Sequence, residues 1–258
     1  MKILSKTELS QGGRLILLYG PTGVGKTTSI LQTSPEPILY IQTEPRSLKP
    51  SLDATGRENI DVDVAVYEDF LGLMEFVANP KNCERHRTVV VDSYSHLMSV
   101  GLSSEIEDQA FEARDPKEKL TKSLVMQTKM SLEGYGGLSS HMFRLTTALG
   151  KISRMGKVVV VTALMAESPR WNRELAAAPA LKGREFPINM PGFFDLIGLV
   201  EPRTDAEGKI VYPPRVRFQS PDDSFVAKFT GAGTKTQGPL NINKIITTEK
   251  EKSYEAGK

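Results

Sequence analysis

The chain has 258 residues, a formal net charge of +2 and a single cysteine, Cys83. One cysteine excludes an intramolecular disulfide and is typical of proteins in a reducing cytoplasm, where we expect this one to work. With 39% hydrophobic and 25% charged residues, the composition is that of an ordinary globular protein, and it excludes neither nucleic-acid binders nor metabolic enzymes. No secretory signal is visible, and no apolar run reaches the roughly 18 residues that a membrane span needs, so we expect no membrane contact.

Apolar segments typical of strands alternate with helical segments along most of the chain. The predicted strands are Arg14–Gly20, Pro37–Ile41, Val62–Tyr67, Thr88–Asp92 and Lys157–Thr162, and the predicted helices are Lys26–Gln32, Phe70–Val77 and Leu138–Met155. This alternation predicts an α/β fold with a mainly parallel, twisted sheet flanked by helices. Shorter apolar segments at Asp195–Val200, Ile210–Phe218 and Phe225–Phe229 predict a short antiparallel C-terminal extension.

Two long stretches lack a clear core pattern, Ser103–Gly137 and Leu164–Pro191. Because long loops in a compact domain are usually functional or disordered, we consider both as candidate binding surfaces. We expect a single domain over residues 1–240, followed by a lysine- and glutamate-rich tail at 241–258 that frays.

The sequence Gly20-Pro-Thr-Gly-Val-Gly-Lys26-Thr27 matches the phosphate-binding pattern G-x-x-x-x-G-K-[ST] in full, between a predicted strand and a predicted helix. Its glycines let the backbone curl so that N–H groups point at a phosphate, and the helix N-terminus adds its positive dipole end. Lys26 is expected to bridge the β- and γ-phosphates, and the Thr27 hydroxyl to bind Mg²⁺. The predicted ligand is ATP with Mg²⁺, bound by Gly20, Pro21, Thr22, Gly23, Val24, Gly25, Lys26, Thr27 and Thr28.

Two further predicted strands end in, or just before, an acid. Asp92 ends the run Thr88-Val-Val-Val-Asp92, and in proteins with this loop such an aspartate holds the Mg²⁺ shell opposite the Thr27 hydroxyl. No glutamate follows Asp92, so the attacking water must be activated from elsewhere. Glu44 is the candidate: if its strand lies beside the phosphate-loop strand, its carboxylate faces the γ-phosphate and orients or deprotonates water.

These segments together resemble the RecA family of recombinase ATPases. Tyr40-Ile-Gln-Thr-Glu44-Pro-Arg-Ser-Leu is similar to the segment with that family's catalytic glutamate, and Thr88-Val-Val-Val-Asp92-Ser93-Tyr-Ser-His-Leu is similar to its Mg²⁺-binding aspartate strand. The resemblance covers most of residues 13–232 and is nearest to the small, core-only RecA-like ATPases of bacteriophages that are linked to single-strand annealing. It implies ATP hydrolysis in DNA recombination, in the host cytoplasm if the gene is a phage's.

The resemblance also implies a ring or filament in which a neighbouring subunit completes the active site. Val226-Ala-Lys228-Phe-Thr-Gly231 is similar to a strand whose lysine and arginine reach the neighbour's γ-phosphate. Lys228 matches, whereas Thr230 replaces the arginine. The family's polar γ-phosphate sensor is replaced by the apolar pair Ala163 and Leu164. Thr162, just before them, either contacts phosphate or the lytic water or is an ordinary β-branched strand residue.

In the resembling family two mobile loops grip single-stranded DNA, and by position they fall in the two stretches that lack a core pattern. The second stretch contains Arg170, Trp171, Arg173, Lys182 and Arg184, a mixture that suits neutralisation of the DNA backbone and base stacking. The expected partners are therefore single-stranded DNA and further copies of the chain, with a single-strand-binding or annealing protein as an additional partner.

The sequence thus predicts an ATP-hydrolysing protein that acts on single-stranded DNA, with Lys26, Glu44, Asp92 and Lys228 as its catalytic residues. Three alternatives stay open: a ring-forming motor of the helicase type, a small-molecule P-loop kinase with an arginine-bearing lid, and a nucleotide-gated assembly protein with little hydrolysis. The preference for ATP over GTP rests on the resemblance, since the chain lacks a guanine-reading Asn/Thr-Lys-x-Asp motif.

Overall fold

Strand β1 (Arg14–Gly20) lies inside a mainly parallel sheet and is buried from Leu15 onward. Parallel neighbours flank it on both sides, β5 (Val158–Pro169) and β7 (Leu196–Thr204). An uninterrupted apolar run is what such a strand requires, because helices cover both of its faces. The structure is a computed structural model that describes residues 13–112, 130–169, 175–230 and 236–247.

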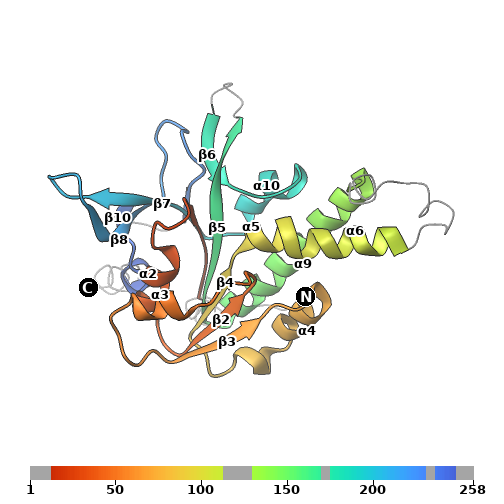
Figure 1. The fold of residues 1–258 in the computed structure, drawn as a ribbon, viewed down its shortest axis with the longest axis horizontal. Coiled ribbons are helices and arrows are strands. Elements are labelled where there is room, and N and C mark those ends of the chain that lie inside the picture. Colours follow the sequence, from red (N-terminus) through yellow and green to blue (C-terminus); the bar gives the residue numbers. More distant parts are fainter. Residues whose placement is uncertain (1–12, 113–129, 170–174, 231–235, 248–258) are drawn as a thin grey trace, which may run out of the picture.

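The strands that the structure describes follow the order β10-β8-β7-β1-β5-β4-β2-β3 (Figure 1). On the β5 side, the sheet continues in parallel through β4 (Thr88–Asp92), β2 (Ile38–Gln42) and β3 (Val62–Val66). On the β7 side it becomes antiparallel, through β8 (Ile210–Arg217), β10 (Gln237–Pro239) and the short β9 (Lys228–Phe229). The predicted α/β class, with a mainly parallel sheet and an antiparallel C-terminal extension, is confirmed.

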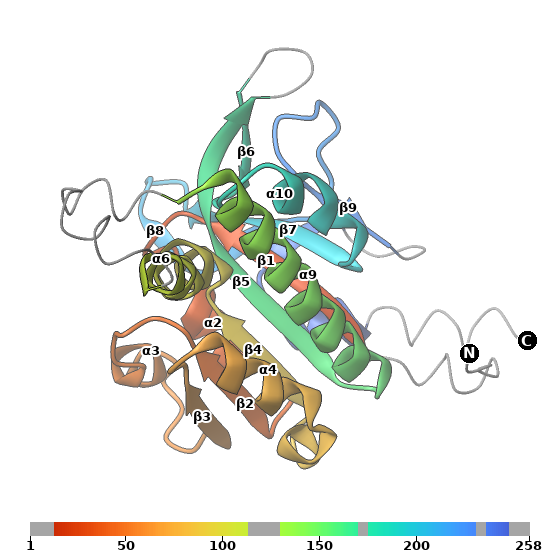
Figure 2. The same ribbon diagram turned by 90° about the vertical axis from the view of Figure 1, so that its right-hand side faces the viewer.

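Helices cover both faces of the sheet, and the sheet separates two hydrophobic cores, one on each face. Because side chains alternate along a strand, Leu17 and Tyr19 of β1 pack with α4 (Phe70–Ala78) and α9 (Leu132–Arg154), whereas Ile16 and Leu18 pack on the side of α2 (Lys26–Thr33). Figure 2 shows α9 running across the sheet. Among the described residues, no helix combines the length and the hydrophobicity that crossing a membrane requires.

Further helical elements lie within the described residues. These are α3 (Lys49–Asp53), η1 (Pro80–Cys83), α5 (Tyr94–His96), the π-helical turn η2 (Leu97–Gly101), α6 (Leu102–Glu112), α10 (Glu185–Asn189) and η3 (Met190–Gly192). The segments α5, η2 and α6 follow one another directly after β4, so the residues that follow Asp92 begin a nearly continuous helical segment.

The stretches predicted to lack a core pattern are more ordered than expected. Within Ser103–Gly137, α6 runs to Glu112 and α9 already begins at Leu132. Its N-cap Ser131 accepts a hydrogen bond from the backbone N–H of Gly134 at 3.0 Å, which fixes the first turn of a glycine-rich segment. Within Leu164–Pro191, β5 continues to Pro169 and pairs with the antiparallel β6 (Leu175–Pro179). Backbone pairing, which the hydrophobic pattern does not report, forms this hairpin.

The chain also remains ordered past residue 240, where the sequence predicted a fraying tail to begin. Leu240 and Ile242 are fully buried, and residues 242–247 are helical. The backbone N–H of Ile242 donates to Thr33 Oγ1 at 2.9 Å, at the end of α2. The predicted boundary is therefore too early; residues 248–258 of the predicted tail lie outside the described residues.

Candidate functional site

The phosphate-binding pattern forms the turn between β1 and α2. Gly23 and Gly25 have φ angles of 74° and 93°, in the left-handed region that favours glycine, and Gly25 is the N-cap of α2. Lys26, at the start of that helix, is only 9% exposed. Its ammonium group donates to the carbonyl oxygens of Gly20 and Pro21, at 2.9 Å each, so the lysine folds back across its own loop. A phosphate would replace these carbonyl oxygens as its partner.

Burial perturbs the charge of this lysine. Desolvation lowers the pKa of Lys26 from 10.5 to about 8, and the Arg46 guanidinium acts in the same direction, while the carboxylates of Asp92 and Glu44 oppose the shift. The site therefore holds its cation at a cost, and added negative charge would stabilise it. This is the electrostatic environment expected of a site for an anionic ligand.

Asp92, the last residue of β4, is 4% exposed and accepts three hydroxyl hydrogen bonds. Its Oδ2 accepts from Thr27 Oγ1 at 2.8 Å and from the Tyr40 hydroxyl, and its Oδ1 accepts from Thr162 Oγ1. Burial, followed by the nearby Asp92 charge, raises the pKa of Tyr40, so that its hydroxyl stays a neutral donor. Donors from three other elements thus fix both oxygens of this carboxylate.

Glu44 follows β2 and lines the same site, although β2 does not occupy the expected position in the sheet. Its strand does not lie beside β1, because β5 and β4 stand between them, so that condition of the prediction is wrong. Its carboxylate instead accepts from Ser93 Oγ at 2.9 Å and forms an ion pair with Arg46, with 2.6 Å between Nε and Oε2. Glu44 nevertheless lines the same cavity as Lys26 and Asp92. Its predicted action on the attacking water stays a prediction.

These side chains line one cavity with a volume of about 900 Å³. It opens at the carboxyl ends of the parallel strands, where ligands of α/β sheets ordinarily bind, and its size suits a nucleotide. The lining includes Thr22–Ser29, Gln32, Glu44, Arg46, Ser51, Asp92, Ser93, Thr162, Tyr212 and Pro213. Tyr212 lies against the phosphate-binding loop, since a Cβ added at Gly25 would come within 2.8 Å of its ring.

Tyr40, Thr162, Arg46 and Tyr212 received no firm role from the sequence; of these, Tyr40 donates to Asp92 but does not line the cavity. Tyr40 and Thr162 sit at or near the ends of apolar strands, so their positions beside Asp92 were readable as strand-end polar groups. Arg46 and Tyr212 carried no such signal, because each approaches the cavity from a loop or from the antiparallel strands.

The remaining predicted site residues lie elsewhere. The Lys228 ammonium donates to the Pro191 carbonyl at 2.9 Å and does not line the cavity of its own molecule, as its predicted role in a neighbour requires. Lys182 donates to the carbonyl of Ser99 at 3.0 Å, whereas Arg184 is exposed. Arg170, Trp171 and Arg173 lie outside the described residues.

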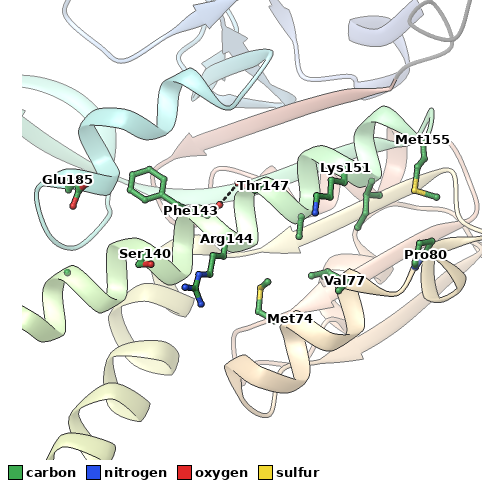
Figure 3. Close-up of a pocket in the computed structure, with 14 residues that line it drawn as sticks. Met74, Val77, Pro80, Ser140, Phe143, Arg144, Thr147, Lys151, Met155 and Glu185 are labelled. Atoms are coloured by element: carbon green, nitrogen blue, oxygen red, sulfur yellow. Dashed lines mark hydrogen bonds between the residues drawn. The ribbon is translucent and has the colours of Figure 1, made fainter. Parts of the chain in front are cut away.

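A second cavity, of about 640 Å³, is a groove between α4 and α9 (Figure 3). Met74 and Val77 line it from α4, and Phe143, Arg144 and Lys151 line it from α9. It shares no lining residue with the first cavity, so it does not contribute to the site at the phosphate-binding loop.

A family model described as an AAA domain matches residues 13–256, a span that contains the whole cavity. The chain belongs to the AAA domain family. P-loop domains of this family typically bind nucleotides with Mg²⁺, and the phosphate-binding loop lines the cavity. The finer likeness to phage recombinases stays a prediction.

No curated protein matches this AAA domain chain. Among solved structures, a KaiC-like protein from the hyperthermophilic archaeon Pyrococcus horikoshii OT3 is similar, with 12% sequence identity and a TM-score of 0.43. The match covers 80% of this chain and 78% of that one. At this level the similarity supports no conclusion about function.

The residues present fit Mg²⁺. Thr27 Oγ1 and Asp92 Oδ2 lie 2.8 Å apart and are the hard oxygen donors that this ion prefers. Among the described residues there is no group of three or more histidine, cysteine or acidic side chains placed to hold a metal. That agrees with an ion held by one or two protein oxygens together with substrate phosphates.

Proposed function

We propose that this protein hydrolyses ATP in the cavity at the phosphate-binding loop and acts on single-stranded DNA as a homo-oligomer. The observation that supports hydrolysis most directly is that Lys26, Thr27, Asp92 and Glu44 line one cavity, although they come from three separate segments of the chain. Such an arrangement supplies phosphate binding, metal binding and a carboxylate for the water within one site.

Each side chain has a distinct task in this mechanism. Lys26 neutralises the charge that develops on the phosphate oxygens. When bound, Mg²⁺ would withdraw further charge from these oxygens, and Thr27 and Asp92 are the residues that would hold it. Glu44 orients the attacking water, and Ser93, whose Oγ donates to Glu44 Oε1 at 2.9 Å, fixes the direction of its carboxylate.

The base of the nucleotide has an apolar wall available. Tyr212 and Pro213 line the cavity beside Gly25, on the side of the antiparallel strands. An aromatic ring stacks on any base, so this wall supports nucleotide binding without choosing adenine over guanine.

The DNA part of the proposal rests on the family resemblance and on the β5–β6 hairpin. This hairpin extends past Leu164, where pairing between β5 and β1 ends (Figure 1). In the sequence, the predicted DNA-binding residues Arg170, Trp171 and Arg173 fall between its two strands. Arg184 is exposed on the segment that follows. A basic and aromatic sequence of this kind suits contact with a single strand.

The test is steady-state ATP hydrolysis by the purified protein, alone and with single-stranded or duplex DNA, over a range of protein concentrations. A rate that rises with single strands, and faster than linearly with protein, supports the proposal. A rate that is linear in protein and indifferent to DNA contradicts the DNA role, and phosphate transfer to a metabolite would indicate a kinase. Directional unwinding of duplex DNA would indicate a helicase-type motor.

Glu44→Gln provides the matching variant. It keeps the shape of the side chain and removes the charge that orients water, so we expect nucleotide binding to persist while turnover falls by about 10²-fold or more. Glu207→Gln, at an exposed turn outside the cavity, is the control. Unchanged turnover in Glu44→Gln would remove Glu44 from the active site.

A further inference from the structure

Arg46 lines the cavity at the phosphate-binding loop, although the mechanism above gives it no task. Its backbone is fixed by a neighbouring side chain: Gln42 Nε2 donates to the carbonyl oxygen of Glu44 at 2.7 Å and to that of Arg46 itself. The Arg46 side chain, in contrast, is 55% exposed. A tethered backbone with a solvent-accessible side chain allows the guanidinium to leave the site without unfolding the loop.

The guanidinium contacts the same atoms that are expected to hold the metal. Its Nη2 lies 3.2 Å from Thr27 Oγ1 and 3.4 Å from Asp92 Oδ2, while its Nε lies 2.6 Å from Glu44 Oε2. A single cationic group therefore joins the hydroxyl, the metal-binding carboxylate and the carboxylate for the water. A divalent cation bound between Thr27 and Asp92 would have to take this place.

The charges around the cavity disfavour holding the Arg46 guanidinium and a divalent ion there at the same time. Among the described residues that line it, the charged side chains are Lys26, Arg46, Glu44 and Asp92, two of each sign, and His96 and Tyr212 are the further titratable groups. With Arg46 in place the two carboxylates are already balanced. A divalent ion added beside a guanidinium would meet like charge at close range, unless further negative charge arrives with it.

We propose that Arg46 fills the Mg²⁺ position of the nucleotide-free protein and leaves it when Mg²⁺ arrives with a triphosphate. This inference rests on the proposed function of the cavity. A triphosphate would bring the additional negative charge that lets a second cation enter the cavity, and Thr27 and Asp92, released from Arg46, would be the residues that hold the metal. Metal binding would thereby depend on nucleotide, and without nucleotide Arg46 forms ion pairs with both Glu44 and Asp92.

The test measures the metal alone. Mn²⁺ is titrated into the nucleotide-free protein, and the free ion is followed by electron paramagnetic resonance. Arg46→Gln removes the competing cation, so we expect Mn²⁺ to bind at least about tenfold more tightly than to the unaltered protein, the scale of one lost charge-assisted contact. Arg57→Gln is the control, because Arg57 is also a partly exposed, ion-paired arginine but does not line the cavity.

Two more variants make the result specific. Asp92→Asn combined with Arg46→Gln should remove the gain in Mn²⁺ affinity, and Arg46→Lys, which keeps the charge, should gain less than Arg46→Gln. Equal or weaker Mn²⁺ binding by Arg46→Gln would overturn the proposal, as would a gain that survives Asp92→Asn. The Mn²⁺ titration uses no nucleotide, so a failure of the protein to bind or hydrolyse ATP would be seen separately.

A second measurement uses a fluorescent ATP analogue with Mg²⁺ or with EDTA. The ratio of the Kd in EDTA to the Kd in Mg²⁺ should rise in Arg46→Gln by the same factor as the Mn²⁺ affinity. An unchanged ratio would show that Arg46 does not compete with the metal.

Discussion

Replacing Thr162 with valine would remove one hydroxyl group and nearly preserve the shape of the side chain. Thr162 is fully buried in β5, and its Oγ1 donates to Asp92 Oδ1. The substitution leaves a buried carboxylate oxygen without that donor, because Thr27 and Tyr40 both donate to the other oxygen, Oδ2. A lost hydrogen bond to a charged group costs about 1.5–3 kcal/mol of unfolding free energy.

For a domain of this size that loss corresponds to a decrease in Tm of roughly 3–12 °C. Urea unfolding and calorimetry of the nucleotide-free protein without Mg²⁺ would measure it. Thr147→Val is the matched control, because Thr147 Oγ1 bonds only the Phe143 carbonyl on the exposed side of α9. If the unfolding free energy of Thr162→Val lies within about 0.5 kcal/mol of that of the unaltered protein, the buried carboxylate does not depend on this hydroxyl and our reasoning about Asp92 fails.

Three further outcomes are expected. Gly25→Ala should abolish nucleotide binding in a titration with a fluorescent ATP analogue, because the position has φ 93° and a Cβ there would come within 2.8 Å of the Tyr212 ring. Gly208→Ala is the control and should bind normally, because that glycine has φ 81° but no atom within 4 Å of an added Cβ. Tyr212→Ala should raise the Kd for ATP and GTP alike, by about tenfold, the value of one lost stacking contact. Since the pKa of Lys26 falls to about 8 from 10.5 on folding, the unfolded chain binds the extra proton between these values. The unfolding free energy of the nucleotide-free protein should therefore rise between pH 8 and 10.5 by about 3 kcal/mol more than that of Lys26→Met, measured by urea titration at each pH. If the two proteins show the same change of unfolding free energy with pH, the lowered pKa of Lys26 is contradicted.

The parts of the site that sequence predicts well are those formed by local structure. The phosphate-binding loop follows from a buried strand, glycines at positive φ and a helix start, all of which are encoded within a short segment. Asp92 is likewise set by the strand that it ends. The order of the strands is not local, which is why the expected neighbour of β1 was wrong, although Glu44 still lines the cavity.

Arg46 and Tyr212 show what the sequence pattern does not contain. An arginine after an acid is ordinarily a solvated loop residue, and only the fold brings this one to Asp92 and Thr27. Tyr212 reaches Gly25 because β8 extends the sheet beyond β7, which no periodicity in either segment reports. Contacts between residues this distant in sequence depend on packing rather than on spacing.

Strand β5 runs from the interior of the site to the hairpin that it forms with β6. Its residue Thr162 touches Asp92, and the same strand continues without interruption to Pro169, about 23 Å farther at the usual rise of roughly 3.3 Å per residue. The hairpin is braced where the Tyr19 hydroxyl donates to the carbonyls of Ala177 and Val226, at 3.1 and 2.7 Å. One continuous strand therefore joins the contact with Asp92 to the hairpin.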